Sequence, residues 1–228
     1  MSSPDGPPTV PHRPVELPME EMHRRAVAFH ELMARRRSVR HFSDRPVPRA
    51  LMAELIATAA TAPSGAHKQP WTFCLVGHPE LKRRIREAAE AEEHASYHGR
   101  MSDEWLADLA PLGTDWHKPF LETAPWLVVV FKQVHGQDAD GARRKHYYVE
   151  ESVGLACGVL LAAAQHAGLV TLTHTPSPMN FLARLLDRPA NERPYLLIPM
   201  GFAAPDCRVP DLVRKPLTEV LVPYLSPR

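Results

Sequence analysis

The sequence predicts one folded domain of mixed helices and strands behind a loose N-terminal arm. Its 228 residues suffice for a single domain with a sizeable core. Apolar residues at three- and four-residue spacing indicate helices, and short continuous apolar runs indicate strands. Residues 1–18 are rich in proline and poor in apolar side chains, so we expect them to be disordered and residues 19–228 to form the domain.

Composition narrows the functional classes. The net charge is +1, from 27 basic and 26 acidic residues, which implies no broad field for nucleic acid or membranes. The 3 cysteines lack C-x-x-C spacing, which argues against a disulfide framework or structural zinc and fits a reducing compartment. No signal-peptide pattern is present, and the apolar run 153–164 is too short to span a bilayer. We therefore expect a soluble, cytoplasmic protein.

The first half of the chain alternates helix, turn and strand patterns. Helices are predicted over 19–37, 49–60 and 79–97, a strand over 71–76, and residues 38–42 look extended. Residues 98–118 have weak periodicity. They are a candidate active-site lid or a surface excursion packed by its own tryptophans.

The second half contains the most apolar elements. Residues 126–131 are apolar throughout, as expected for a strand buried on both faces. A long helix with many small residues is predicted over 146–167, either as the central helix or as part of a subunit interface. The remaining predictions are a loop over 134–144, strands over 169–173 and 195–200, a short helix over 179–186, and an extended C-terminal arm over 209–228.

Residues 61–71 connect a predicted helix to a predicted strand. Pro63 and Pro70 lack amide hydrogens, and Gly65 permits unusual backbone angles or close approach of a ligand. The Ser64 hydroxyl and the amides of residues 64–66 are donors for a flat, electron-accepting ligand. An ordinary helix-to-strand loop remains the alternative.

Other polar clusters each leave two interpretations open. Arginines 36, 37 and 40 form either a phosphate clamp or a solvated helix end. Thr173 and Thr175 flank His174 in a possible site or a simple strand end. His94 and His98 have zinc-binding spacing, but no third ligand is evident.

Common catalytic signatures are absent from the sequence. It has no G-x-G-x-x-G after a strand, no P-loop and no G-x-S-x-G elbow. Four clusters remain: the three arginines, residues 64–66, the two threonines, and Arg214-Lys215. All are basic or hydroxylic, which suits an anionic, planar cofactor with a phosphate tail.

Two of these clusters carry a resemblance. Arg36-Arg37-Ser38-Val39-Arg40, followed by Ala62–His67 and Pro70-Trp71, resembles the flavin-dependent nitroreductase superfamily. Glu93, Tyr97 and Lys118 are the more specific part and are similar to the iodotyrosine deiodinase family. The resemblance extends over roughly residues 33–220.

The resemblance implies a homodimer of α+β subunits that binds FMN at the interface. Each subunit would have a nitroreductase-like mixed, mainly antiparallel central sheet flanked by helices, and the two would exchange terminal arms. The Thr173 hydroxyl would be catalytic, with a hydrogen bond to flavin N5. By similarity, the cofactor-binding residues would be Arg36, Arg37, Ser38, Val39, Arg40, Pro63, Ser64, Gly65, Thr173, His174, Thr175 and Arg214.

The implied substrate is a halotyrosine. Glu93 would bind its ammonium and Lys118 its carboxylate, Tyr97 would add a hydroxyl, and the Ala66 amide would bind the phenolate. The implied reaction is reductive dehalogenation of iodotyrosine to tyrosine and iodide by reduced flavin in single-electron steps. An external flavin or NAD(P)H-dependent donor would supply the electrons.

Two other functions remain open. One is a general FMN nitroreductase or quinone reductase that uses NAD(P)H, and the other is a flavin- or ligand-binding protein without turnover. The sequence also departs from the animal members of the family. It lacks their membrane anchor, as expected for a bacterial-type homologue, and residues 174–179 differ from the animal pattern around the flavin.

Overall fold

The computed structural model describes residues 8–225 and divides the chain into two compact units, residues 1–35 and 36–228. In the first unit, residues 8–18 form no helix or strand, and α1 (Met19–Ala34) begins where it was predicted but ends three residues before the predicted end at 37. Residues 1–7 of the expected disordered arm and 226–228 of the expected C-terminal arm lie outside the described residues. No described helix is both long and apolar enough to cross a membrane.

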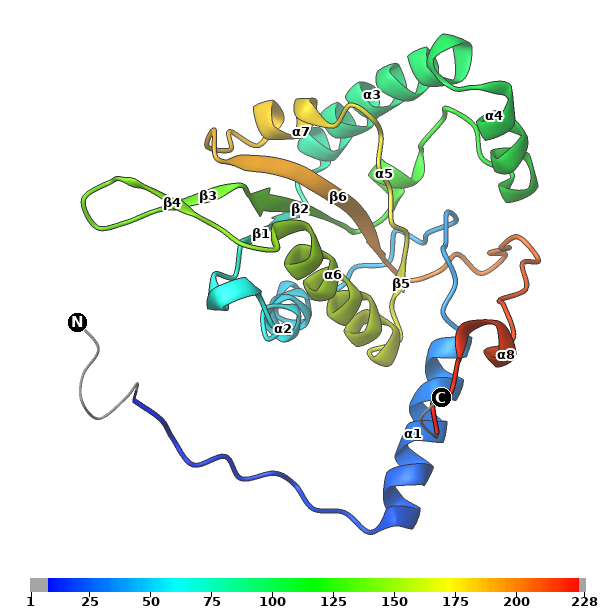
Figure 1. The fold of residues 1–228 in the computed structure, drawn as a ribbon. Coiled ribbons are helices and arrows are strands. Elements are labelled where there is room, and N and C mark those ends of the chain that lie inside the picture. Colours follow the sequence, from blue (N-terminus) through cyan, green and yellow to red (C-terminus); the bar gives the residue numbers. More distant parts are fainter. Residues whose placement is uncertain (1–7, 226–228) are drawn as a thin grey trace. The chain divides into compact units, whose positions relative to one another are not determined.

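The second unit is built on a four-stranded antiparallel sheet. Its strands are β1 (Trp71–Val76), β2 (Trp126–Gln133), β6 (Glu192–Gly201) and β5 (Val170–Thr171), in the spatial order β1-β2-β6-β5 (Figure 1). This confirms the predicted mainly antiparallel sheet. The segment after α1 joins the sheet edge through a parallel bridge between Ser38 and Thr171, so it is extended as predicted.

Strand β2 is buried on both faces. Val128 and Val130 face one hydrophobic core, whereas Leu127, Val129 and Phe131 face a second core on the other side. All five side chains are fully buried. Successive side chains of a strand point to opposite faces, which explains why an uninterrupted apolar run occurs here.

Two layers of helices cover the sheet (Figure 1). One core contains residues of α2 (Arg49–Ala59) and α6 (Val149–His166). The other contains residues of α3 (Pro79–Ala95), α5 (Phe120–Thr123) and α7 (Asn180–Leu185). The unit is therefore a helix–sheet–helix sandwich, in agreement with the α+β fold class.

The predicted loop over 134–144 is instead a β-hairpin. Strands β3 (His135–Gln137) and β4 (Arg143–Lys145) pair outside the main sheet and project from it (Figure 1). The turn is closed by Asp138, whose side chain accepts a hydrogen bond from the Ala142 amide at 2.8 Å. The prediction was wrong because both strands are short and polar, without the apolar alternation that marks a strand.

The segment after α3 is helical but broken. α3 continues into a wide π-helical turn, η2 (Ser96–Arg100), followed by α4 (Asp103–Leu109) and a 3₁₀ turn, η3 (Ala110–Leu112). Gly113 then adopts a left-handed conformation with φ of 58°, which glycine tolerates well. One short helix, α8 (Leu217–Val220), interrupts the otherwise extended C-terminal arm.

Candidate active site

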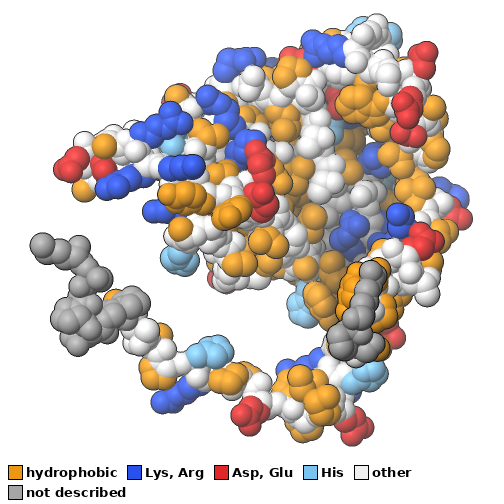
Figure 2. Space-filling view, viewed as in Figure 1, with side chains coloured by type: hydrophobic (Ala, Val, Ile, Leu, Met, Phe, Trp, Pro, Cys, Tyr) orange, Lys and Arg blue, Asp and Glu red, His pale blue; other side chains and the backbone are white. Residues whose placement is uncertain are grey.

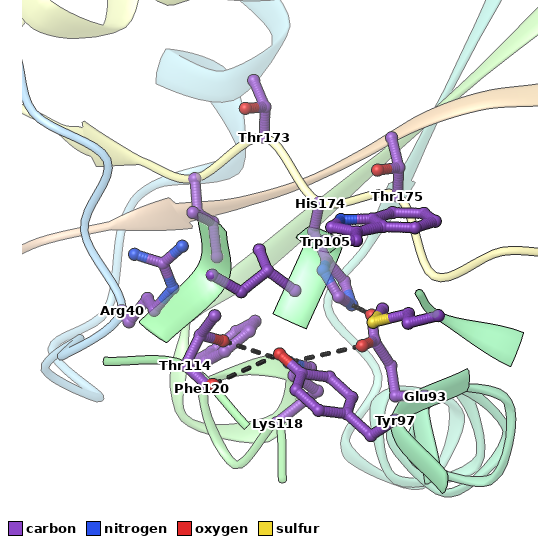
Figure 3. Close-up of a pocket in the computed structure, with 13 residues that line it drawn as sticks. Arg40, Glu93, Tyr97, Trp105, Thr114, Lys118, Phe120, Thr173, His174 and Thr175 are labelled. Atoms are coloured by element: carbon purple, nitrogen blue, oxygen red, sulfur yellow. Dashed lines mark hydrogen bonds and ion pairs between the residues drawn. The ribbon is translucent and has the colours of Figure 1, made fainter. Parts of the chain in front are cut away.

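A cavity lies between the end of α3 and the segment after β5, with α4 beside it (Figure 3). Seven of the residues named from sequence line it: Arg40, Glu93, Tyr97, Lys118, Thr173, His174 and Thr175. They come from four segments that are far apart in sequence. The structure therefore assembles all three predicted zwitterion-binding side chains beside the predicted flavin-binding threonines.

Glu93 and Lys118 form a buried ion pair in this cavity. Lys118 Nζ lies 3.6 Å from Glu93 Oε2, and the side chains are only 4% and 11% exposed. Burial raises the pKa of Glu93 and lowers the pKa of Lys118, while each charge opposes the shift of the other. The separation exceeds a normal hydrogen bond, so both groups retain capacity for an incoming charged ligand.

The end of the lid segment orients Lys118 and Tyr97. Lys118 Nζ donates to Thr114 Oγ1 at 3.3 Å and to the Asp115 carbonyl. The Tyr97 hydroxyl donates to the Thr114 carbonyl at 3.2 Å. Residues 114–118 thus connect the lid directly to the two side chains.

Thr173, His174 and Thr175 form an extended segment on β6. The His174 amide donates to the Leu197 carbonyl at 2.8 Å, and the Leu197 amide returns a bond at 3.0 Å. Side chains alternate along such a segment, so the two threonines are exposed and His174 is buried on the opposite side. The His174 ring faces Glu93 (Figure 3).

A second cavity contains the predicted arginine cluster. Arg36, Arg37, Arg40 and Arg214 line it, and Arg40 also lines the first cavity, so the two adjoin. Arg36, Arg37 and Arg40 form no ion pair with any carboxylate among residues 8–225. Burial lowers the pKa of Arg36, and the neighbouring Arg214 and Arg37 lower it further. The cations in this partly buried cavity repel one another, and a bound anion would stabilise them.

The C-terminal arm forms the far side of this second cavity. Arg214 Nη2 donates to the Arg36 carbonyl at 2.7 Å, and Arg37 donates to the Pro210 carbonyl. Ser38 is exposed at the cavity, whereas the Val39 side chain is in the hydrophobic core. Val39 can therefore meet a ligand only through its main chain. An anionic, phosphate-bearing ligand fits this donor set.

The loop containing Pro63, Ser64, Gly65 and Ala66 lines neither cavity. It packs on the start of α6, where the Gly65 amide donates to Ser152 Oγ at 3.2 Å. Here a Cβ on Gly65 would lie 2.5 Å from the Tyr147 carbonyl oxygen, so glycine is required by close approach.

The same loop leaves the Ala66 amide available as a donor. Ser64 Oγ accepts from the Gln69 amide at 2.9 Å, so its lone pairs are partly used. Ala66 has a positive φ of 50°, and its amide has no hydrogen-bond partner in the described chain. Strained backbone with an unused donor is typical of a ligand-binding turn.

Several cavity residues were not predicted. Thr114 and Phe120 lie beside Lys118, and Leu172 precedes Thr173. Sequence proximity could have indicated them, since each of the three lies within four residues of a predicted site residue. His94 and His98 stack with ring centroids 4.0 Å apart, and no group of three potential metal ligands occurs in the described part of the chain.

Comparisons with known proteins identify the family of this chain. The family model described as "Nitroreductase family" matches residues 33–202. Iodotyrosine deiodinase of Haliscomenobacter hydrossis is 56% identical over 215 residues, which cover 94% of this chain and 97% of the relative. Human iodotyrosine deiodinase 1 is 49% identical over 90% of this chain and 71% of the relative. A crystal structure of oxidized iodotyrosine deiodinase bound to FMN and 3-iodo-L-tyrosine superposes with a TM-score of 0.73, at 30% identity, over 87% of this chain and 99% of that one.

Proposed function

The chain belongs to the nitroreductase family and to its iodotyrosine deiodinases, and from this membership we propose that it is an FMN-dependent oxidoreductase acting on halotyrosines. It removes the halogen reductively, converting iodotyrosine to tyrosine and iodide. This reaction consumes two electrons and one proton, which an external flavin or NAD(P)H-dependent donor supplies through the cofactor.

The buried Glu93–Lys118 pair carries this proposal. An amino-acid zwitterion presents one cation and one anion close together, and this pair presents the complementary charges 3.6 Å apart beside Tyr97. The ammonium binds to Glu93 and the carboxylate to Lys118. Such a pair has no use in reducing an uncharged nitroarene or quinone.

The cofactor is proposed to bind across the two adjoining cavities. Arg36, Arg37, Arg40 and Arg214 hold the phosphate and ribityl region, with Ser38 as a further donor. The exposed hydroxyls of Thr173 and Thr175 face the flavin ring. When bound, FMN would supply the two electrons of the reduction, and the Thr173 hydroxyl would donate a hydrogen bond to flavin N5, which would favour single-electron steps.

The lid segment, residues 98–118, is proposed to exclude water from this chemistry. Trp105 lines the cavity although its side chain is half exposed, so it is placed to cover a bound aromatic ring. Thr114 contacts both Tyr97 and Lys118, so a bound zwitterion would fix the end of the lid.

We propose a homodimer because the loop at residues 63–66, which is predicted to contact the flavin, lines neither cavity of its own chain. Pro63, Ser64 and Gly65 would reach the flavin of the second copy, and the Ala66 amide would reach the substrate phenolate there. Supporting this, α6 beside the loop exposes Leu155, and the C-terminal arm exposes several large apolar residues. These are Leu212, Val213, Leu217, Val220, Leu221, Val222, Tyr224 and Leu225. We propose that the terminal arms are exchanged and that the dimer is cytoplasmic, consistent with three free thiols.

Glu93→Gln and Lys118→Ala test the function. Each change removes one charge of the pair, so iodotyrosine binding to the FMN-loaded protein should weaken at least tenfold. Reduction of a neutral nitroarene should continue at a similar rate, because it needs no zwitterion contact. Flavin spectral titration and iodide release measure the two properties.

Unchanged iodotyrosine affinity in both variants would refute the zwitterion site and favour a general nitroreductase or quinone reductase. Wild-type protein that binds FMN but releases no iodide from iodotyrosine under dithionite would be a flavin-binding protein without this turnover.

A further inference from the structure

His174 is the one buried titratable side chain of the cavity that the proposed reaction leaves without a task. Its side chain is 9% exposed, and its backbone is fixed by two hydrogen bonds to Leu197. Phe120 packs edge-on against the imidazole, with centroids 5.7 Å apart and planes at 86°. The ring is thus held in one orientation.

The edge of this ring points at Glu93. His174 Nε2 lies 3.8 Å from Glu93 Oε1, beyond hydrogen-bond length, and it has no hydrogen-bond partner in the described chain (Figure 3). A buried nitrogen without a partner is costly and requires an explanation. Burial, Lys118 and Arg40 lower the pKa of His174 to about 3, so the ring is neutral and carries one N–H.

The two oxygens of Glu93 therefore face different groups. Oε2 faces the Lys118 ammonium and Oε1 faces the His174 nitrogen, at 3.6 and 3.8 Å. When a zwitterionic ligand binds, the Lys118 ammonium interacts with both the ligand carboxylate and Glu93. Glu93 then needs a second donor to stay oriented and ionised toward the ligand ammonium, and a shift of about 1 Å brings His174 into hydrogen-bond range.

We propose that His174 is a positioning residue that selects amino-acid substrates. In the ligand complex, its Nε2–H donates to Glu93 Oε1 and aims the carboxylate at the substrate ammonium. This inference rests on the proposed function and adds a determinant of specificity: the site distinguishes a halotyrosine from a plain halophenol partly through a residue that touches neither.

The test uses FMN-loaded protein and two ligands. 3-Iodotyrosine carries the zwitterion, and 2-iodophenol carries the same halophenol without it. His174→Leu removes the donor at similar size, whereas His174→Gln restores an N–H at about the same reach. Flavin spectral titration should show His174→Leu weakening iodotyrosine about tenfold, the effect of one hydrogen bond to a charged group, with 2-iodophenol unchanged within about twofold. His174→Gln should recover most of the loss.

A double-mutant cycle shows whether His174 acts through Glu93. In a Glu93→Gln background, the additional His174→Leu change should cost little further affinity for iodotyrosine. Equal weakening of both ligands, an undiminished iodotyrosine affinity, or a full additive loss in that background would each overturn the inference. If the leucine variant does not fold, His174→Asn replaces it, since the shorter amide cannot reach Glu93. Wild-type protein that binds neither ligand would instead refute the proposed function, and the inference with it.

Discussion

The protonation of individual side chains in the site depends on charges that are buried away from water. Glu93 and Lys118 lose hydration together, and each limits the pKa shift that burial imposes on the other. His174 is affected differently. Although the Glu93 carboxylate lies 3.8 Å from its Nε2, burial and the cationic Lys118 and Arg40 all act in the same direction and lower its pKa.

This asymmetry predicts acid sensitivity. The unfolded chain protonates His174 near pH 6.5, whereas the folded chain does so only near pH 3, so acidification favours the unfolded state. Between pH 7.5 and 5.5, His174 should cost about 1.4 kcal/mol of folding free energy. Denaturant titration at the two pH values should show a smaller loss for His174→Gln than for wild type, by about that amount.

Wild type and His174→Gln share every other titratable group, so the difference between their two losses of stability reports on His174. Parallel losses in wild type and variant would show that His174 is protonated as readily in the folded chain as in the unfolded one. That result would contradict the lowered pKa that burial, Lys118 and Arg40 impose on His174.

Sequence alone identified some residue contacts and not others. Glu93 and Tyr97 are one helical turn apart, which predicts a shared face, and the cavity confirms it. The sequence spacing does not predict that Lys118 lies near Glu93. The expectation that both bind one zwitterion came from the family resemblance. The inward direction of His174 follows from strand alternation, but its approach to Glu93 depends on where α3 ends, which only the folded chain fixes.

Among the elements, the junction between α3 and α5 shows how the lid's end is anchored. Lys82 extends from α3 to the end of α5, where its buried Nζ donates to the Glu122 carbonyl at 2.7 Å and the Ala124 carbonyl at 2.8 Å. These carbonyls lack helical partners because α5 ends there. Lys82 thus caps the short helix that follows Lys118.

Lys82→Met should therefore destabilise the fold by about 2 kcal/mol, because it leaves two buried carbonyls unsatisfied. Chemical denaturation measures the change. The adjacent Arg83→Met removes only exposed pairs with Glu80 and Glu87 and should have a far smaller effect. Equal stability of the two variants would mean that the Lys82 cap contributes nothing beyond surface contacts.

The elements themselves were largely predictable. β1 has the predicted bounds, and α2 and α6 end within a residue of their predicted ends, because strong apolar patterns and glycine or proline boundaries determine them. The hairpin β3–β4 was missed because its stability comes from backbone pairing and the Asp138 turn. The end of α3 was placed within two residues, but its π-helical continuation has no distinctive sequence pattern.

For the whole molecule, the candidate site is divided between two places on one chain. The arginines and threonines adjoin Glu93 and Lys118, while the loop at Gly65 packs on α6 beside Ser152. Basic and acidic side chains are interspersed on the face in Figure 2, with hydrophobic side chains exposed among them, so no charged surface dominates it. The sequence predicted the members of both groups but not their separation, because that depends on long-range packing.

The division leads to a prediction about assembly. Leu155 is 53% exposed on α6, next to Gly158, where an added Cβ would meet open space. If a second copy covers this face, Leu155→Arg buries a charge in the interface and should give a monomer. FMN should then bind at least tenfold more weakly, because the loop of the partner no longer reaches the ring. Light scattering and flavin absorbance measure both outcomes on one sample.

Ala91→Arg is the matched control, since Ala91 is exposed on α3, on the other side of the sheet, and an arginine there meets only solvent. It should leave mass and FMN content unchanged. A Leu155→Arg monomer that retains FMN at wild-type affinity would show that one chain supplies every cofactor contact, and the loop at residues 63–66 would then need another role. A variant that stays dimeric would instead place the interface elsewhere than this face of α6. Loss of mass and flavin together is the outcome that links the separated loop to the cavities of a second copy.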